Sequence, residues 1–157
     1  MDRITLHRLD HTGLIAFAGE DVQSFLQGQL SCDVGALTSD NSTYGSYCTP
    51  KGRALATFLL WRAGPDFFMQ LPAALRESIQ KRLSMFVLRA RVKAADASDA
   101  YARFGLAGSE AADLIKTVFA AVPAGPLEVK SADDATLIRH MAGRPIEQTG
   151  TCMRPTA

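Results

Sequence analysis

The sequence predicts an α+β fold of mostly antiparallel sheets, with helices packed on one face. Short runs of β-branched and aromatic residues recur along the chain, and Gly, Pro and Asp residues between them favour tight turns. Apolar residues at helical spacing occupy three separate segments. Tight turns join antiparallel strands, whereas parallel strands need long crossovers, so a doubly wound parallel sheet fits less well.

The first elements are predicted to be a hairpin and a helix. Residues 4–9 and 14–18 form strand-like runs around a turn at residues 10–13, where Gly and Asp supply turn conformations. Four apolar residues then recur at helical spacing behind two acidic residues, whose charges favour a helix N-terminus. We therefore expect a helix over about residues 21–30.

The middle of the chain is predicted to form three strands and a second helix. The strands span residues 44–48, 54–61 and 67–71, and turn residues separate them. Pro72 is tolerated at the start of a helix, and apolar residues recur every four positions after it. This helix should pack on the sheet.

The remaining chain is predicted to mix strands with a third helix. The helix begins at Ser109 and its apolar spacing continues to Val122. Strands are expected at residues 86–92, 101–106, 127–130 and 136–141. We expect one domain over residues 1–145, with room for two subdomains over about 1–95 and 96–145, and an atypical tail over 146–157.

The composition indicates a globular domain without a strong overall charge. The chain has 47% hydrophobic and 21% charged residues, which is typical of a globular domain, and a formal net charge of +1. Such a charge creates no whole-molecule attraction to nucleic acid or to an acidic membrane. The sequence has no membrane-spanning run and no leader pattern at its N-terminus, so we expect a cytoplasmic protein.

Cysteine and histidine placement argues against several kinds of site. The three cysteines are odd in number and far apart, which favours reduced thiols over disulfides or a metal site. The three histidines have no acidic or thiol neighbour at metal-ligand spacing. Hydrolase and P-loop motifs are also missing, so no metal ligand and no nucleophile with its base are visible.

Residues 27–33 form the most unusual stretch. Gly28 lies late in the predicted helix, where glycine costs roughly 1 kcal/mol relative to alanine. Either a ligand or a second strand approaches the backbone closely here, or the stretch is an ordinary helix C-terminal turn with two solvated glutamines.

Two groups of cations are candidate anion sites. Lys51 and Arg53 are expected at the tip of a hairpin, where they are either solvated or free to meet an anion. Arg89, Arg91 and Lys93 alternate with apolar residues, so on a strand they would share one face about 6.6 Å apart. That face is either the solvated side of a half-buried strand or a stripe that binds a polyanion.

Three segments resemble, in order and spacing, the YgfZ-type folate-binding family, a relative of the glycine-cleavage T-protein. They are residues 25–34, 47–53 and 83–92, within a resemblance that is close over residues 4–92 and looser over 101–145. The resemblance implies a T-protein-like folate-binding fold with tetrahydrofolate as cofactor. It also implies an accessory role in maintaining iron–sulfur enzymes, and through them tRNA modification, with iron–sulfur proteins such as tRNA-modifying enzymes as partners.

On this resemblance and the residue types, one set of residues is expected near the cofactor. It comprises Gln27, Gln29, Asp33, Tyr47, Lys51, Arg53, Arg89 and Arg91. No catalytic residue is assigned, because Ala56 and Thr57 stand where the T-protein carries an Asp pair used in aminomethyl transfer. The chain is therefore not expected to be an ordinary aminomethyltransferase.

The sequence departs from the family towards its end. It lacks the Lys-Gly-Cys-x-x-Gly-Gln-Glu segment of the family's C-terminal half, and Cys152 has none of the flanking residues of that segment. The tail over 146–157 is unlike the family, as in a truncated or frameshifted chain. Edge strands left exposed by a missing half would favour self-association.

Two alternative functions stay open on the sequence. One is a folate-dependent one-carbon transferase in which Asp33 supplies the acid. The other is an RNA-binding module that uses the cation stripe, although the near-neutral charge and the lack of an RNP-type aromatic pattern count against it.

Overall fold

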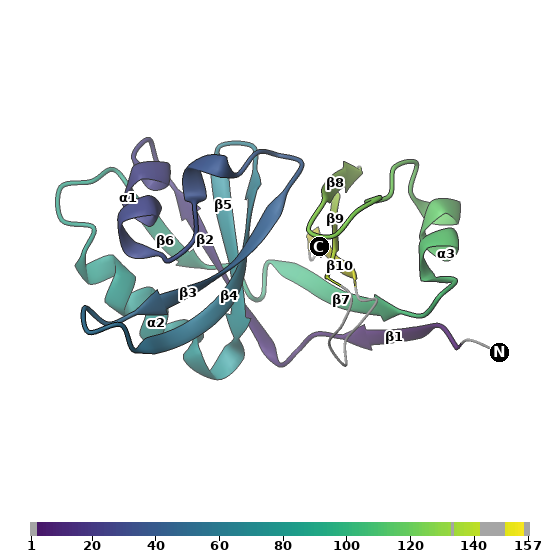
Figure 1. The fold of residues 1–157 in the computed structure, drawn as a ribbon, viewed down its shortest axis with the longest axis horizontal. Coiled ribbons are helices and arrows are strands. Elements are labelled where there is room, and N and C mark those ends of the chain that lie inside the picture. The colour runs from purple at the N-terminus through teal and green to yellow at the C-terminus, as the bar shows by residue number, and fades with distance from the viewer. Residues whose placement is uncertain (1–2, 133, 142–149, 156–157) are drawn as a thin grey trace. The chain divides into compact units, whose positions relative to one another are not determined.

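The computed structural model describes residues 3–132, 134–141 and 150–155, and these residues form two units (Figure 1). One unit is His11–Ser98, and the other contains the described residues of 1–10 and 99–157. Each unit holds one five-stranded sheet. None of the helices in the described ranges is long and apolar enough to span a bilayer.

The sheet of the His11–Ser98 unit is antiparallel throughout. Its order is β3-β4-β5-β2-β6. The strands are β2 (Thr12–Ala18), β3 (Ser42–Cys48), β4 (Ala54–Ala63), β5 (Asp66–Pro72) and β6 (Lys93–Asp96). The predicted succession of three strands in the middle of the chain is confirmed, because β3, β4 and β5 are joined by tight turns and pair in sequence order.

Helices cover one face of this sheet. They are α1 (Val22–Gln29), the short 3-10 helix η1 (Val34–Ala36) and α2 (Ala73–Met85), and both predicted α-helices are confirmed (Figure 1). Alternate residues of the strands point towards the helices, as the pleat requires, and form one buried cluster with them. The cluster includes Ile15, Phe17, Leu26, Val34, Phe58, Leu60, Phe67, Met69, Ile79 and Leu83.

The sheet of the second unit is also antiparallel, with order β1-β7-β10-β9-β8. The strands are β1 (Thr5–Arg8), β7 (Tyr101–Ala107), β8 (Val129–Ala132), β9 (Ala135–Arg139) and β10 (Gly150–Pro155). The helix α3 (Ala111–Val118) stops before the predicted Val122, because Phe119 adopts an extended backbone. The predicted α+β class with mostly antiparallel sheets is therefore confirmed.

The predicted opening hairpin is wrong. Strands 4–9 and 14–18 do form, as β1 and β2, but β1 pairs with β7 whereas β2 pairs with β5 and β6. The turn between them carries the chain from one sheet to another. Turn chemistry is local, so it cannot reveal which distant strands compete for each partner.

The predicted strand over residues 86–92 is also wrong. These residues form turns, in which the Ala90 N–H donates to the Val87 carbonyl at 2.9 Å and Leu88 has a positive φ of 48°. Arg89 and Arg91 therefore do not share a strand face with Lys93, which begins β6. The cation stripe expected from the alternation does not exist.

Part of the predicted atypical tail takes part in the fold. Residues 150–155 form β10, which lies between β7 and β9 in the second sheet. The remaining tail residues, 146–149 and 156–157, lie outside the described residues.

Candidate ligand-binding site

The end of α1 lies along the outer edge of β3. Leu30 and Tyr47 form an isolated antiparallel bridge. Beside it, the Ser31 N–H donates to the Ser46 carbonyl at 3.0 Å, and the Ser46 N–H donates to the Ser31 hydroxyl at 2.8 Å. The two segments at residues 25–34 and 47–53 thus meet in space, although 12 residues separate them in the sequence.

Gln27 shapes the turn that follows the helix. Its side-chain carbonyl accepts a hydrogen bond from the Gly35 N–H at 2.9 Å. That bond holds the start of η1, where Asp33 occupies the N-cap position with its side chain exposed. Gln27 therefore positions this turn, while the Asp33 carboxylate is exposed to solvent.

Gly28 leaves open space on the surface of α1. A Cβ at this position would meet no atom of the described residues within 4 Å. Of the explanations for this glycine, close approach of a second strand is therefore excluded for the described part of the chain. Gln29, the half-buried last residue of α1, lies next to this space.

The β3-β4 hairpin presents two cations. The Thr49 N–H donates to the Arg53 carbonyl, and the Gly52 N–H donates to the Thr49 carbonyl, both at 2.8 Å. Gly52 has a φ of +82°, which a glycine adopts without strain. Lys51 and Arg53 are both exposed at this turn. The hydrogen-bonded turn fixes where both side chains leave the backbone.

Tyr47 differs from the other expected site residues because it is 3% exposed and belongs to the buried cluster. It pairs with Ala56 on β4 and bridges to Leu30 on the other side. Its position fixes the edge to which the end of α1 is attached.

Sequence reasoning missed a small hydroxyl and thiol network at this edge. The Ser46 hydroxyl donates to the Ser31 hydroxyl at 3.0 Å, and it also lies 3.5 Å from the Cys48 sulfur. Nearby, burial raises the pKa of the Cys32 thiol, so this cysteine stays protonated at neutral pH. Both serines lie in or next to the flagged segments, but only the strand register shows that they meet.

Arg89 and Arg91 lie away from this edge. The Arg91 N–H donates to the Asp21 carboxylate at 2.7 Å, and the Arg91 guanidinium pairs with Glu20. These contacts tie residues 86–92 to the first turn of α1, whereas Gln29 is at the other end of that helix. An eight-residue helix is about 12 Å long, so the two arginines are not part of the same cluster.

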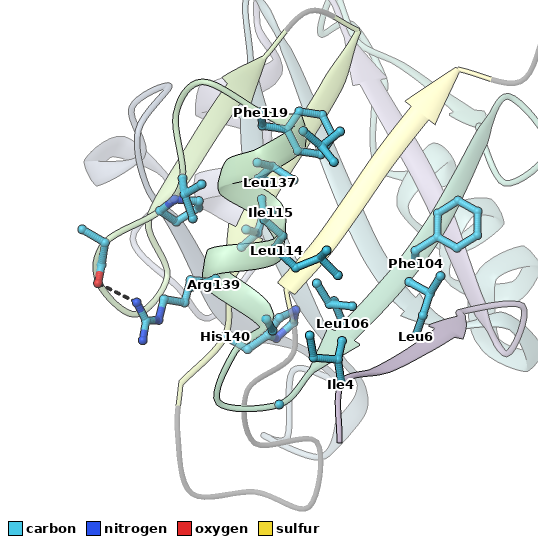
Figure 2. Close-up of a pocket in the computed structure, with 18 of the residues that line it drawn as sticks. Ile4, Leu6, Phe104, Leu106, Leu114, Ile115, Phe119, Leu137, Arg139 and His140 are labelled. Atoms are coloured by element: carbon cyan, nitrogen blue, oxygen red, sulfur yellow. Dashed lines mark hydrogen bonds between the residues drawn. The ribbon is translucent and has the colours of Figure 1, made fainter. Parts of the chain in front are cut away.

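A separate apolar groove lies in the second unit (Figure 2). It has a volume of about 550 Å³ and is lined by residues of β1, β7, α3, β9 and the loop after α3. Its polar side chains are Ser109, Arg139 and His140. Burial lowers the pKa of His140, so the imidazole is neutral at neutral pH. None of the residues expected near the cofactor lines this groove.

Proteins similar to this chain share both its sequence and its fold. The tRNA-modifying protein YgfZ of Colwellia psychrerythraea is 30% identical over 140 residues, which are 89% of this chain and 43% of that protein. The protein of the same name from Escherichia coli O7:K1 is 28% identical over 143 residues, or 90% of this chain and 44% of that one. The chain thus spans less than half the length of these curated relatives.

A solved structure agrees with the predicted fold. The glycine cleavage system aminomethyltransferase T from Bartonella henselae superposes with a TM-score of 0.83 at 19% identity, covering 97% of this chain and 42% of that one. The GCVT N-terminal domain family matches residues 2–140. The predicted relationship is confirmed, and the chain belongs to the GCVT N-terminal domain family.

Proposed function

We propose that this chain is a folate-binding accessory protein that supports iron–sulfur enzymes and thereby tRNA modification. Its family and the name of its relatives, tRNA-modifying protein, support a role connected with tRNA modification. Tetrahydrofolate as the cofactor, and iron–sulfur proteins as the partners, are the finer parts of the proposal.

The observation that carries the proposal is the meeting of the α1 end with the β3-β4 hairpin. The Leu30 and Tyr47 bridge joins the two segments: the end of α1 carries Gln29 and is followed by the exposed Asp33, and the hairpin turn carries the exposed Lys51 and Arg53. Folate has a pterin ring with amino and amide groups at one end and a glutamate tail at the other. Cations bind the tail carboxylates. At the other end, a carboxylate accepts hydrogen bonds from the pterin amino and N–H groups, and an amide can both donate to the pterin and accept from it.

Each residue then has a role in the proposed site. Asp33 and Gln29 bind the pterin end, and Lys51 and Arg53 bind the glutamate tail. Gln27 and Tyr47 act as positioning residues, because one holds the turn at Gly35 and the other is buried beneath the edge. The open space beside Gly28 gives the ligand room against the helix.

Arg89 and Arg91 are better placed for a partner than for folate. Arg91 is already paired with Glu20, and Arg89 is exposed in the turns that follow α2. The proposed partner surface therefore lies at the start of α1, and the folate site lies at its end.

Calorimetric titration with tetrahydrofolate tests the proposal. We expect heat of binding from the wild-type chain and a loss of about 100-fold or more in affinity in the double variant Lys51→Ala/Arg53→Ala, because charged hydrogen bonds contribute about 1.5–3 kcal/mol each and the variant removes both. Lys81→Ala/Arg89→Ala removes the same charge from exposed positions outside the site and serves as the matched control. No binding, or equal losses in both double variants, would refute the proposed site.

The one-carbon transferase alternative is weaker on structural grounds. Ala56 and Thr57 carry no carboxylate, and Ala56 is buried in the core cluster. Turnover of a tetrahydrofolate one-carbon donor that disappears in Asp33→Asn would nevertheless establish the transferase. We expect binding to weaken in Asp33→Asn with no turnover in either protein.

The RNA-binding alternative is not retained. It rested on three cations sharing one strand face, and residues 86–92 form turns instead.

A further inference from the structure

The end of α2 and the turn that follows it expose large apolar side chains. Met85 is 62% exposed, Phe86 is 45% exposed and Leu88 is 86% exposed. Because only Val87 separates them, the three side chains form one local apolar surface. Exposed apolar side chains that cluster, rather than occurring singly, mark interaction surfaces.

Hydrogen bonds on both sides hold this segment in place. On the α2 side, the Val87 N–H donates to the Ser84 carbonyl at 3.3 Å, and on the other side the Arg91 N–H donates to the Asp21 carboxylate at 2.7 Å. Between them, Leu88 has a φ of +48°, which leucine rarely adopts and which persists where the surrounding structure imposes it. The fold thus holds an exposed leucine in a fixed conformation, and such preorganisation lowers the entropy lost on binding.

Uncompensated cations border the apolar surface. Residues 78–95 contain five cationic residues and no acidic one, although the whole chain has a net charge of +1. Lys81 and Arg82 lie one helical turn before the apolar side chains, and Arg89 directly follows them. Within the described residues none of these three has an ion-pair partner, and the Arg82 Nε is buried without a hydrogen-bond partner. The surface is therefore complementary to a ligand that carries carboxylates.

We propose that this cationic apolar patch, residues 81–89, binds an acidic segment of a partner protein in which apolar side chains and carboxylates lie side by side. The apolar side chains of that segment cover Phe86 and Leu88, and its carboxylates pair with Lys81 and Arg89. Arginine binds a carboxylate through two parallel hydrogen bonds, and protein interfaces are enriched in Met, Phe and Arg. The inference names the chemistry of the partner surface in the proposed function, and it rests on that part of it.

A continuous anionic surface fits this patch less well than a discrete acidic segment. Glu20 pairs with the Arg91 guanidinium and Asp21 accepts from the Arg91 N–H, so two carboxylates lie beside the end of the segment. An acidic bilayer or a phosphate backbone would meet these carboxylates together with the cations. The aliphatic Met85 and Leu88 also offer nucleic-acid bases no ring to stack on. A protein segment can contact the cations and leave the carboxylates aside.

Fluorescence anisotropy with a labelled synthetic peptide tests the patch. The peptide is an amphipathic helix of about 15 residues, because shorter isolated helices are marginal in water, with leucines on one face and glutamates on both sides of them. We expect it to bind the wild-type chain, whereas a matched peptide with lysine in place of glutamate should not bind. Lys81→Ala/Arg89→Ala should weaken binding of the acidic peptide about tenfold, since two exposed ion pairs are lost.

Leu88→Asn tests the apolar part of the patch. Asparagine adopts a positive φ more readily than leucine, so the turn should keep its conformation and the variant should unfold at the same urea concentration or a higher one. Affinity for the acidic peptide should nevertheless fall about tenfold or more, because the apolar area that leucine buries on binding is removed.

Two double variants separate this inference from the folate site. Lys51→Ala/Arg53→Ala removes the same charge outside the patch and should leave peptide affinity unchanged, whereas Lys81→Ala/Arg89→Ala should leave tetrahydrofolate affinity unchanged. A chain that binds the peptide but no tetrahydrofolate would refute the folate site alone. A chain that binds tetrahydrofolate but no peptide would refute the patch alone.

Three further results would overturn the patch. They are equal binding of the lysine peptide, unchanged peptide affinity in Lys81→Ala/Arg89→Ala or in Leu88→Asn, and an equal loss in Lys51→Ala/Arg53→Ala. Binding to phosphatidylglycerol vesicles or to single-stranded RNA in place of the acidic peptide would also overturn it, and would show a lipid or RNA surface instead.

Discussion

The two units of this chain contain similar sheets, but the described apolar side chains beside the groove of the second unit are partly exposed. In the His11–Ser98 unit, Leu26, Leu60 and Met69 are fully buried between helices and sheet. In the other unit, Leu6 and Val118 remain about two-thirds exposed beside a groove. Both sheets have five strands, so strand number does not explain the difference.

Helix coverage explains it. Two α-helices and a 3-10 helix lie on one face of the first sheet, whereas the single eight-residue helix α3 accompanies the second among the described residues. The stability of the first unit therefore depends on its own packing.

The largest expected effect comes from opening the closed core. Leu26→Ala should lower the free energy of unfolding by about 3 kcal/mol, because it removes buried methyl groups and leaves a cavity. Leu114→Ala, at a 45% exposed position of α3, should cost less than about 1 kcal/mol. Urea unfolding of the first unit can be followed by Trp61 fluorescence, since Trp61 is the one tryptophan of the chain, and that of the second by hydrogen exchange in β7. Equal losses at both leucines would contradict the contrast between the units.

The next largest effect is expected at glycines where an added Cβ would lie too close to the neighbouring backbone. A Cβ at Gly19 would clash with the Arg91 carbonyl oxygen, and Gly19 has a φ of +129°. Gly19→Ala should therefore cost about 2 kcal/mol in urea unfolding. The matched control is Gly108→Ala in the second unit, where φ is +133° but the added Cβ would lie 3.0 Å from its nearest neighbour. A smaller loss at Gly19 than at Gly108 would show that residues 86–92 are not held tightly.

Gly28→Ala should stabilise the chain, whereas the previous substitutions destabilise it. The new Cβ meets no described atom, and alanine is favoured over glycine in a helix, so stability should rise by up to about 1 kcal/mol. If folate occupies the open space, its affinity should fall in the same variant. Urea unfolding and calorimetry on one preparation measure both quantities. A stabilised variant with unchanged folate affinity would place the ligand elsewhere.

The smallest effect is a pH dependence confined to the second unit. Burial lowers the pKa of His140 below its usual 6.5, so below about that pH the unfolded chain binds more protons than the folded one. Stability should therefore fall as pH drops from about 8 through this region, and His140→Gln should flatten the dependence. Hydrogen exchange in β9 at a series of pH values measures it.

Glu128 contributes to the pH dependence of stability over a lower pH range than His140. The Gly125 and Ala124 N–H groups lower its pKa, so its contribution is present above about 4.5 and is lost below that value. A slope in the Glu128 range alone would exclude His140 as the cause.

Local patterns predicted most of the first unit. The strands β3 to β5 and the helices α1 and α2 were predicted because turn residues and apolar spacing are encoded within each segment. Residues 86–92 were assigned wrongly because their β-branched and apolar residues suggest a strand, whereas Asp21, 70 residues away, binds the Arg91 N–H. That contact has no signal in the local sequence.

The second unit was harder to predict for the same reason. Its sheet joins β1 to β7 across more than 90 residues, and β10 enters between β7 and β9 from the end of the chain. The candidate site was predicted in part. Its segments were visible in the sequence, but only the Leu30 and Tyr47 bridge showed which of them meet.

The attachment of Leu30 and Ser31 to β3 has a consequence for solubility. β3 is the outermost strand of its sheet, and an open outer strand invites pairing with strands of other molecules. The Ser31 and Ser46 backbone groups already bond to each other, so this rim is partly closed to foreign strands. The contact that assembles the candidate site therefore also guards the sheet against aggregation.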